Sequence, residues 1–190
     1  MRSCASLVVG VFLLLACPSR FLAAAPARAA SPEDHPAVPA ILARAESLFQ
    51  SMKVRDYPAI FAALSAKSRG TIVAETTSAL SAARQATPGK PSAADSPPSA
   101  PPRDPAPGPE AVRRDFVAGG PIARDYWDAF LRRFDPDAAL EHSRWEIGSV
   151  GKDRAEILLT HHGADHPATL KMFREDGGWK VGLVETFWAR

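Results

Sequence analysis

With 190 residues, 46% of them hydrophobic and 23% charged, the chain is long enough for one globular core but too short for two. Loss of the N-terminal leader described below would remove Arg2, Arg20 and Arg28, leaving 20 basic against 21 acidic side chains. The resulting net charge of −1 excludes the basic surface that nucleic-acid binding requires.

The first 29 residues have the composition of a secretory signal peptide. Their apolar run, Ala5 to Ala16, is too short to span a bilayer. Two maturation routes stay open: cleavage after Ala29 would release a soluble protein, whereas "LLAC" at residues 14–17 resembles a bacterial lipobox and would anchor a lipid at Cys17. Both routes predict an exported protein of the periplasm or cell envelope, which would contact the membrane only through such an anchor.

Both cysteines of the chain, Cys4 and Cys17, lie in this leader. The mature part therefore has neither a disulfide nor a thiol nucleophile, so its stability depends on its apolar core. We expect residues 30–36 to be a linker and residues 37–190 to form a single α+β domain.

Helical periodicity runs through the first part of this domain. In "PAILARAESLFQSMK" the apolar stripe consists of Ile41, Ala45, Leu48 and Met52. Asp56 and Pro58 have the residue types of a helix cap and of an early helical position. A third helix is predicted from the spacing of Ile72, Val73, Thr76 and Leu80.

Residues 88–109 interrupt the pattern with nine of the 18 prolines of the chain. The segment has no aromatic or large aliphatic side chain, so it cannot bury enough apolar area to offset its ordering entropy. We predict a disordered insertion in the domain. A Pro-rich docking ligand is the functional alternative, because "SPPSAPP" allows it.

Two helices and a sheet are predicted after the insertion. "EAVRRDFVAGG" ends on a glycine pair that suits a helix stop, and the next helix has an apolar stripe of Ile122, Tyr126, Phe130 and Phe134. The apolar period then changes to that of an antiparallel meander. Its predicted strands are Arg144 to Val150, Arg154 to His161, Ala168 to Arg174 and Trp179 to Trp188.

The register of the meander follows from its turns, above all the hairpin signal Asp176-Gly177. This turn predicts the pairs Met172 with Val181, Leu170 with Leu183, and Ala168 with Glu185. Matching apolar faces across the other turns predicts the pairs Ile147 with Ile157, Trp145 with Leu159, Ile157 with Leu170, and Leu159 with Ala168. His161 would then lie opposite His166, on the core side of the sheet and near Glu185.

The order of helices followed by a curved meander resembles the nuclear transport factor 2-like superfamily, especially its small exported bacterial members. The matching segments are "AESLFQSMKVRDYPAIFAALSAKSR", "RWEIGSVGKDRAEILL" and "LKMFREDGGWKV". The resemblance implies a cone in which helices close over a concave sheet and leave a pocket. Enzymes of the superfamily use Asp, His or Tyr side chains there, but none of their catalytic motifs aligns with this sequence, so the fold alone does not indicate catalysis.

Candidate catalytic chemistry centres on "THHGADH" at residues 160–166. His161 and His166 could act as acid or base beside Glu185, since a neighbouring carboxylate orients an imidazole and raises its pKa. Two imidazoles and a carboxylate would also suit zinc, but no metal-binding motif supports this. The favoured interpretation is structural, with polar residues marking a sheet edge, and we expect neither a metal nor a cofactor.

The expected pocket would be lined by Tyr126, Trp145, Leu159, Glu185 and Phe187. Our leading hypothesis is a non-enzymatic envelope domain that binds a small apolar ligand or a partner protein there. The alternative is an isomerase or dehydratase that uses a pocket histidine as general base.

Two further features have surface interpretations. Homodimerisation could use an outer sheet face carrying Phe173, Val184 and Trp188. The basic pairs Arg113-Arg114 and Arg132-Arg133 could bind anionic lipids or acidic partner proteins. Acidic neighbours favour a solvated face of mixed charge for both pairs.

Overall fold

A computed structural model describes residues 31–86 and 105–188 of the chain. The predicted signal peptide, with Cys17, and most of the predicted Pro-rich insertion lie outside the described residues. Within the described ranges, no helix combines the length and apolar character needed to cross a membrane.

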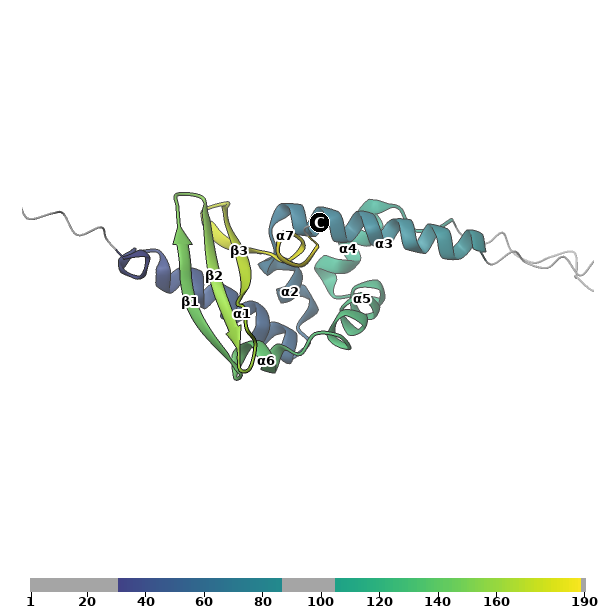
Figure 1. The fold of residues 1–190 in the computed structure, drawn as a ribbon. Helices are drawn as coiled ribbons and strands as arrows, with labels where there is room; N and C mark the ends of the chain where they lie inside the picture. Colours follow the sequence, from purple (N-terminus) through teal and green to yellow (C-terminus); the bar gives the residue numbers. More distant parts are fainter. Residues whose placement is uncertain (1–30, 87–104, 189–190) are drawn as a thin grey trace, which may run out of the picture.

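The described residues form helices followed by a four-stranded antiparallel sheet in the order β1-β2-β3-β4, as the sequence predicts for an α+β fold (Figure 1). The helical elements before the sheet are η1 (Pro32–Asp34), α1 (Val38–Lys53), α2 (Tyr57–Ala63), α3 (Ala66–Ala86), α4 (Pro109–Ala118), α5 (Pro121–Leu131) and α6 (Pro136–Leu140). The sheet and the final helix are β1 (Ser143–Val150), β2 (Arg154–His161), β3 (Ala168–Glu175), β4 (Gly178–Gly182) and α7 (Leu183–Phe187).

Helix boundaries follow the capping chemistry of the sequence. The Asp56 carboxylate accepts a hydrogen bond from the Ala59 backbone at 3.1 Å and caps α2, as predicted. Gly119 ends α4 with a φ of 66°, a left-handed conformation that favours glycine. Helix α6 is not among the predicted helices. It begins as α2 does, with an aspartate cap, Asp135, followed by an early proline, Pro136.

The main core lies between α1 and one face of the sheet. The predicted stripe of α1 is buried, together with Phe49. On the sheet, four inward residues are fully buried: Ile157, Leu170, Met172 and Val181. All the predicted pairs of β1 with β2 and of β2 with β3 that match apolar residues are confirmed, as is the pair Met172 with Val181.

The prediction of a long fourth strand is wrong beyond Gly182. Asp176 and Gly177 form the expected turn with φ values of 50° and 77°, but β4 is short and residues 183–187 turn into α7. Leu183 and Glu185 therefore do not pair with β3. A Thr186 hydroxyl oxygen instead accepts a hydrogen bond from the Lys171 backbone at 3.0 Å, replacing a strand partner.

The other edge of β4 receives a short bridge from the connection between α2 and α3. Leu64 pairs with Val181 in parallel, and the Ser65 backbone donates a hydrogen bond to the Val181 carbonyl at 2.9 Å. Helix α7 lies between the sheet and α3 (Figure 1). The C-terminal end of the described chain is therefore joined to the helical half of the molecule.

Candidate functional site

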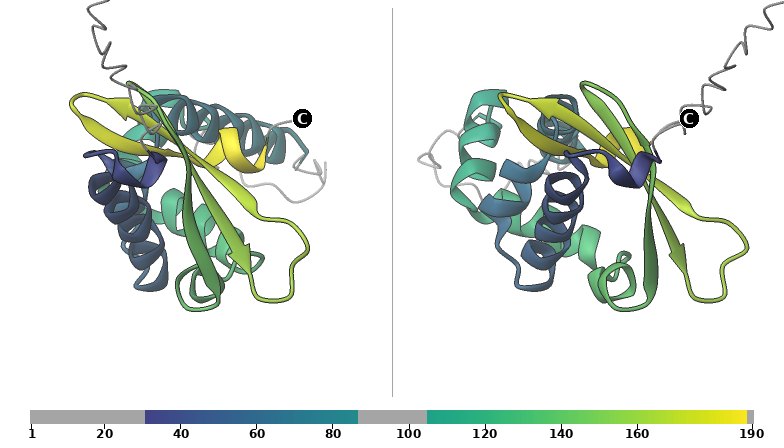
Figure 2. Two further views of the ribbon diagram at one scale, coloured as in Figure 1. Left: turned by 60° about the vertical axis from the view of Figure 1, so that its left-hand side comes forward. Right: turned by 90° about the vertical axis from the view of Figure 1, so that its left-hand side faces the viewer.

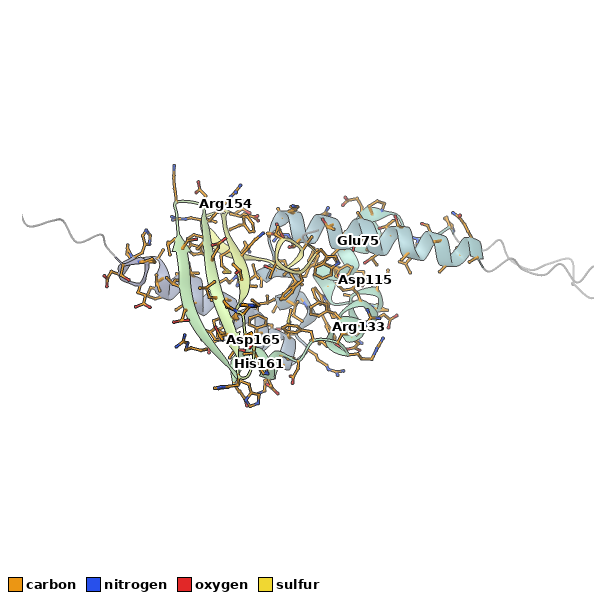
Figure 3. All side chains as sticks on the ribbon, viewed as in Figure 1. Glu75, Asp115, Arg133, Arg154, His161 and Asp165 are labelled. Atoms are coloured by element: carbon orange, nitrogen blue, oxygen red, sulfur yellow. The ribbon has the colours of Figure 1, made fainter. Side chains whose placement is uncertain are left out.

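The histidine segment does not form a site with Glu185. His161, His162 and His166 are all exposed. The last pair of β2 with β3 towards the loop is Leu159 with Ala168, so His161 and His166 are not paired across the two strands. The loop between these strands projects beyond the helices (Figure 2) and places His161 at the far end of the sheet (Figure 3). Hydrogen bonding in this loop is between backbone groups, and Gly163 supplies the positive φ of 83° that the turn needs.

Neither chemical alternative for this segment gains geometric support. No group of three His, Cys, Asp or Glu side chains suited to a metal ion occurs in residues 31–86 and 105–188. The acid-base interpretation needs His161 or His166 beside Glu185, which lies on α7 instead of on the predicted strand. The three proposed groups therefore do not converge, because the strand that should have joined them becomes a helix.

Glu185 has a different environment, in which it joins α7 to the start of α3. Its carboxylate is buried, with 8% exposure of the residue, and accepts hydrogen bonds from the hydroxyls of Ser65 at 2.9 Å and Ser68 at 2.6 Å. The Ser68 oxygen also accepts a hydrogen bond from the Val184 backbone at 3.0 Å. We call Ser65, Ser68 and Glu185 the serine-glutamate junction. Such a satisfied buried network is expected to hold α7 in place.

The five residues expected to line one pocket are divided among several places. Leu159 is buried in the core. Trp145 contacts Phe49 edge-on at 5.6 Å, and its indole donates a hydrogen bond to the Ala139 carbonyl at 2.7 Å. Of the five, Tyr126 and Phe187 lie in the same groove, whereas Glu185 lines another.

The groove shared by Tyr126 and Phe187 is an open depression of about 640 Å³ on the helical side of the molecule. We call it the aromatic groove. It is formed by α3, α5, the chain after α5 and the end of α7. Its lining residues are Glu75, Tyr126, Ala129, Phe130, Arg132, Arg133, Phe134, Phe187 and Trp188.

Aromatic rings form most of the apolar surface of this groove. Phe130 stacks on Trp188 with centroids 6.2 Å apart and planes at 12°, and Phe134 meets Phe187 at 6.0 Å. Phe187 and Trp188 nevertheless remain 45% and 36% exposed. Exposed aromatic rings that gather in a concavity are typical of a binding site.

The polar rim of the groove carries both signs of charge. Arg132 and Arg133 are exposed and form no ion pair with any residue of the described ranges. Figure 3 shows Arg133 and Glu75 on the helical side, away from the sheet. Burial, together with the charge of Glu75, raises the pKa of Tyr126 to about 12, so its hydroxyl stays protonated at neutral pH and can donate a hydrogen bond.

Comparisons with known proteins give no relative from which to assign this site. No protein-family model matches the chain, and neither a similar curated protein nor a similar solved structure was found.

Part of this groove was present in the sequence pattern. The spacing of Tyr126, Phe130 and Phe134 predicts one helical stripe, but the same spacing also fits residues inside the core. For Arg132 and Arg133 the sequence favours a solvated face of mixed charge. Their role as a rim depends on the turn of α7, which brings the last aromatic residues to α5.

The tyrosines give a test of this part of the structure by pH titration. The chain has two, and partial burial and a hydrogen bond from its hydroxyl to Asp128 at 2.8 Å also raise the pKa of Tyr57. We expect less tyrosinate absorbance at pH 10 than two exposed tyrosines would give, because an exposed tyrosine is half ionised at that pH. Tyr126→Phe should remove the component that titrates near pH 12.

The same pKa shift sets the direction of a stability change. Because Tyr126 holds its proton more tightly in the folded state than in the unfolded state, the protonated hydroxyl stabilises the folded state. This stabilisation is fully present below the tyrosine pKa of the unfolded chain, about 10. This contribution of Tyr126 should decline as pH rises from about 10 towards about 12. Normal ionisation of both tyrosines in the folded protein would contradict the burial described here.

Proposed function

We propose that the protein is an exported binding protein of the cell envelope whose aromatic groove holds a small ligand with an apolar, ring-containing body and an acidic group. The leader-like composition of residues 1–29 supports export. The leading expectation from the sequence, a binding domain without assigned catalysis, is kept, but its site moves to the helical side.

The observation that carries the proposal is that exposed aromatic rings and guanidinium groups without an ion pair in the described ranges line the same groove. Phe187 and Trp188 present apolar faces on which a ring can stack. Arg132 and Arg133 lie on the rim of the same groove, where a guanidinium can bind a carboxylate or sulfonate through two parallel hydrogen bonds. The Tyr126 hydroxyl is an additional donor.

We also propose kinship with the nuclear transport factor 2-like superfamily. The order of helices followed by an antiparallel meander supports it, as does the packing of α1 on one face of the sheet. This kinship does not decide the ligand, because proteins of one fold carry unrelated sites.

The proposal can be tested with two fluorescent probes of similar ring system. Anilinonaphthalene sulfonate carries an anionic group, whereas N-phenylnaphthylamine is neutral. The double variant Arg132→Gln and Arg133→Gln should weaken binding of the sulfonate about tenfold, equivalent to about 1.4 kcal/mol, and change the neutral probe little. Titration of probe fluorescence measures both affinities.

The matched control neutralises the other basic pair. Arg113→Gln with Arg114→Gln removes the same charge from α4, outside the aromatic groove, and should leave both affinities within about twofold. Trp188→Ala should weaken both probes, because the stacking surface serves any ring. Equal loss of sulfonate binding in the two arginine pairs would show a general charge effect and refute the groove assignment.

A further inference from the structure

A second groove of about 490 Å³ lies on the outer face of the sheet, beside α7. We call it the basic groove. It is lined by Lys67, Arg154, Ala155, Glu156, Lys171, Met172, Phe173, Val184, Glu185 and Trp188. The residues expected to form a dimer surface line this groove, where Val184 is buried at 7% exposure and Trp188 remains 36% exposed.

The early end of β4 creates this groove. Gly182 is packed so closely against the Phe173 ring that a Cβ at this position would collide with the ring. The chain then turns into α7, which forms one wall, while the outer faces of β2 and β3 form the floor. Lys67, in the first turn of α3, completes the rim.

Three cationic side chains from three different elements surround the groove. Lys67 comes from α3, Arg154 from β2 and Lys171 from β3. Within residues 31–86 and 105–188, none of them forms an ion pair. The Arg154 guanidinium lies 6.0 Å from the centroid of the Phe173 ring, a cation-π contact that favours this position.

Both carboxylates that line the groove accept hydrogen bonds from serine hydroxyl groups. Glu156 accepts a hydrogen bond from Ser149 at 3.1 Å, and Glu185 belongs to the serine-glutamate junction. Neither makes a direct contact with a cation of the groove. The formal balance of three positive and two negative charges therefore leaves ammonium and guanidinium donors free for an anion.

Lys67 also occupies an electrostatically unfavourable place. A cation in the first turn of a long helix is repelled by the positive end of the helix dipole. Two of the first backbone amides of α3 are already taken, since Glu175 accepts from Ala66 at 2.8 Å and Ser65 accepts from Ser68 at 3.0 Å. An anion in the groove would thus be held by side chains, and it would offset the repulsion on Lys67.

We propose that the basic groove binds a small organic phosphate through cationic side chains that the aromatic groove does not share, although Trp188 lines both grooves. Three donors converging from separate elements suit a tetrahedral group with a charge approaching −2 better than a planar carboxylate with one charge. The rings of Phe173 and Trp188 provide a surface for an apolar body attached to the phosphate.

Calorimetric titration with phenyl phosphate tests this assignment. The double variant Arg154→Gln and Lys171→Gln should weaken its affinity at least about tenfold. Glu156→Gln should strengthen it a few-fold, because one repelling charge is removed, and a gain of affinity cannot come from misfolding. Arg144→Gln is the control, since this exposed arginine of β1 already pairs with Glu146 at 2.9 Å and lies outside the groove.

The comparison probes are inorganic phosphate and benzoate. Weaker binding of both than of phenyl phosphate would support a site that needs the phosphate and the ring together. No heat of binding with phenyl phosphate, or the same affinity in the Arg154 and Lys171 double variant, would overturn the proposal. Arg132→Gln with Arg133→Gln should leave phenyl phosphate binding intact, which separates this result from the fate of the aromatic groove.

Discussion

Replacement of Trp127 by alanine should lower the free energy of unfolding by about 3–5 kcal/mol, as expected for loss of a large buried aromatic side chain. Trp127 is fully buried, and its ring meets those of Phe116, Tyr126 and Phe130 edge-on at 6.5, 5.0 and 5.7 Å. Alanine would leave a cavity among rings that cannot all move inward together. Urea denaturation measures the change.

Two other tryptophan variants make the result specific. Trp127→Phe should cost less than Trp127→Ala, because it keeps a ring and removes an indole N–H that has no hydrogen-bond partner in the described structure. Trp188→Ala should cost no more than about 1 kcal/mol, because that ring is partly exposed. Equal losses for Trp127→Ala and Trp188→Ala would contradict the burial difference.

Ser68→Ala should be nearly as damaging, with an expected loss of about 2–4 kcal/mol. The Ser68 hydroxyl donates to Glu185 and accepts from the Val184 backbone, and Ser68 has no exposed surface. Its removal leaves a buried amide without an acceptor and takes one of the two donors from a buried carboxylate. The free energy of unfolding in urea is again the measurement.

Two variants separate this effect from ordinary serine replacement. Ser78→Ala lies on an exposed position of the same helix and should change stability by no more than about 0.5 kcal/mol. Glu185→Gln keeps the shape of the side chain and one good acceptor, so it should cost less than Glu185→Ala. If Ser68→Ala behaves like Ser78→Ala, the serine-glutamate junction does not hold α7.

The sequence pattern predicted the meander well because its physical signals are local. Alternation of apolar residues and the Asp176-Gly177 turn determine which residues face the core, and a slip of one residue would expose all of them. Helix α6 was missed although Asp135 and Pro136 carry its signature, since five residues are too few for a visible apolar period.

The candidate site was harder to predict, because its parts depend on contacts between distant segments. "LVETFW" is rich in β-branched and aromatic residues, which suits a strand, and nothing local shows that Glu185 will be held by Ser65 and Ser68. Tertiary hydrogen bonds override the local β propensity here. The same change of direction carries Phe187, expected on the inner sheet face, to Phe134, and Trp188, expected on the outer face, to Phe130 of α5.

The most direct test of the account is to follow the four tryptophan indole N–H signals by ¹⁵N NMR during titration with anilinonaphthalene sulfonate. The Trp188 signal should shift and saturate with the ligand, also in the variant with Arg154→Gln and Lys171→Gln, because its ring lines the aromatic groove as well as the basic groove. The signal of Trp179, which lies on β4 with 8% exposure, should stay unchanged. Saturable binding that leaves Trp188 unmoved and shifts Trp179 or Trp145 instead would contradict the assignment of the ligand site.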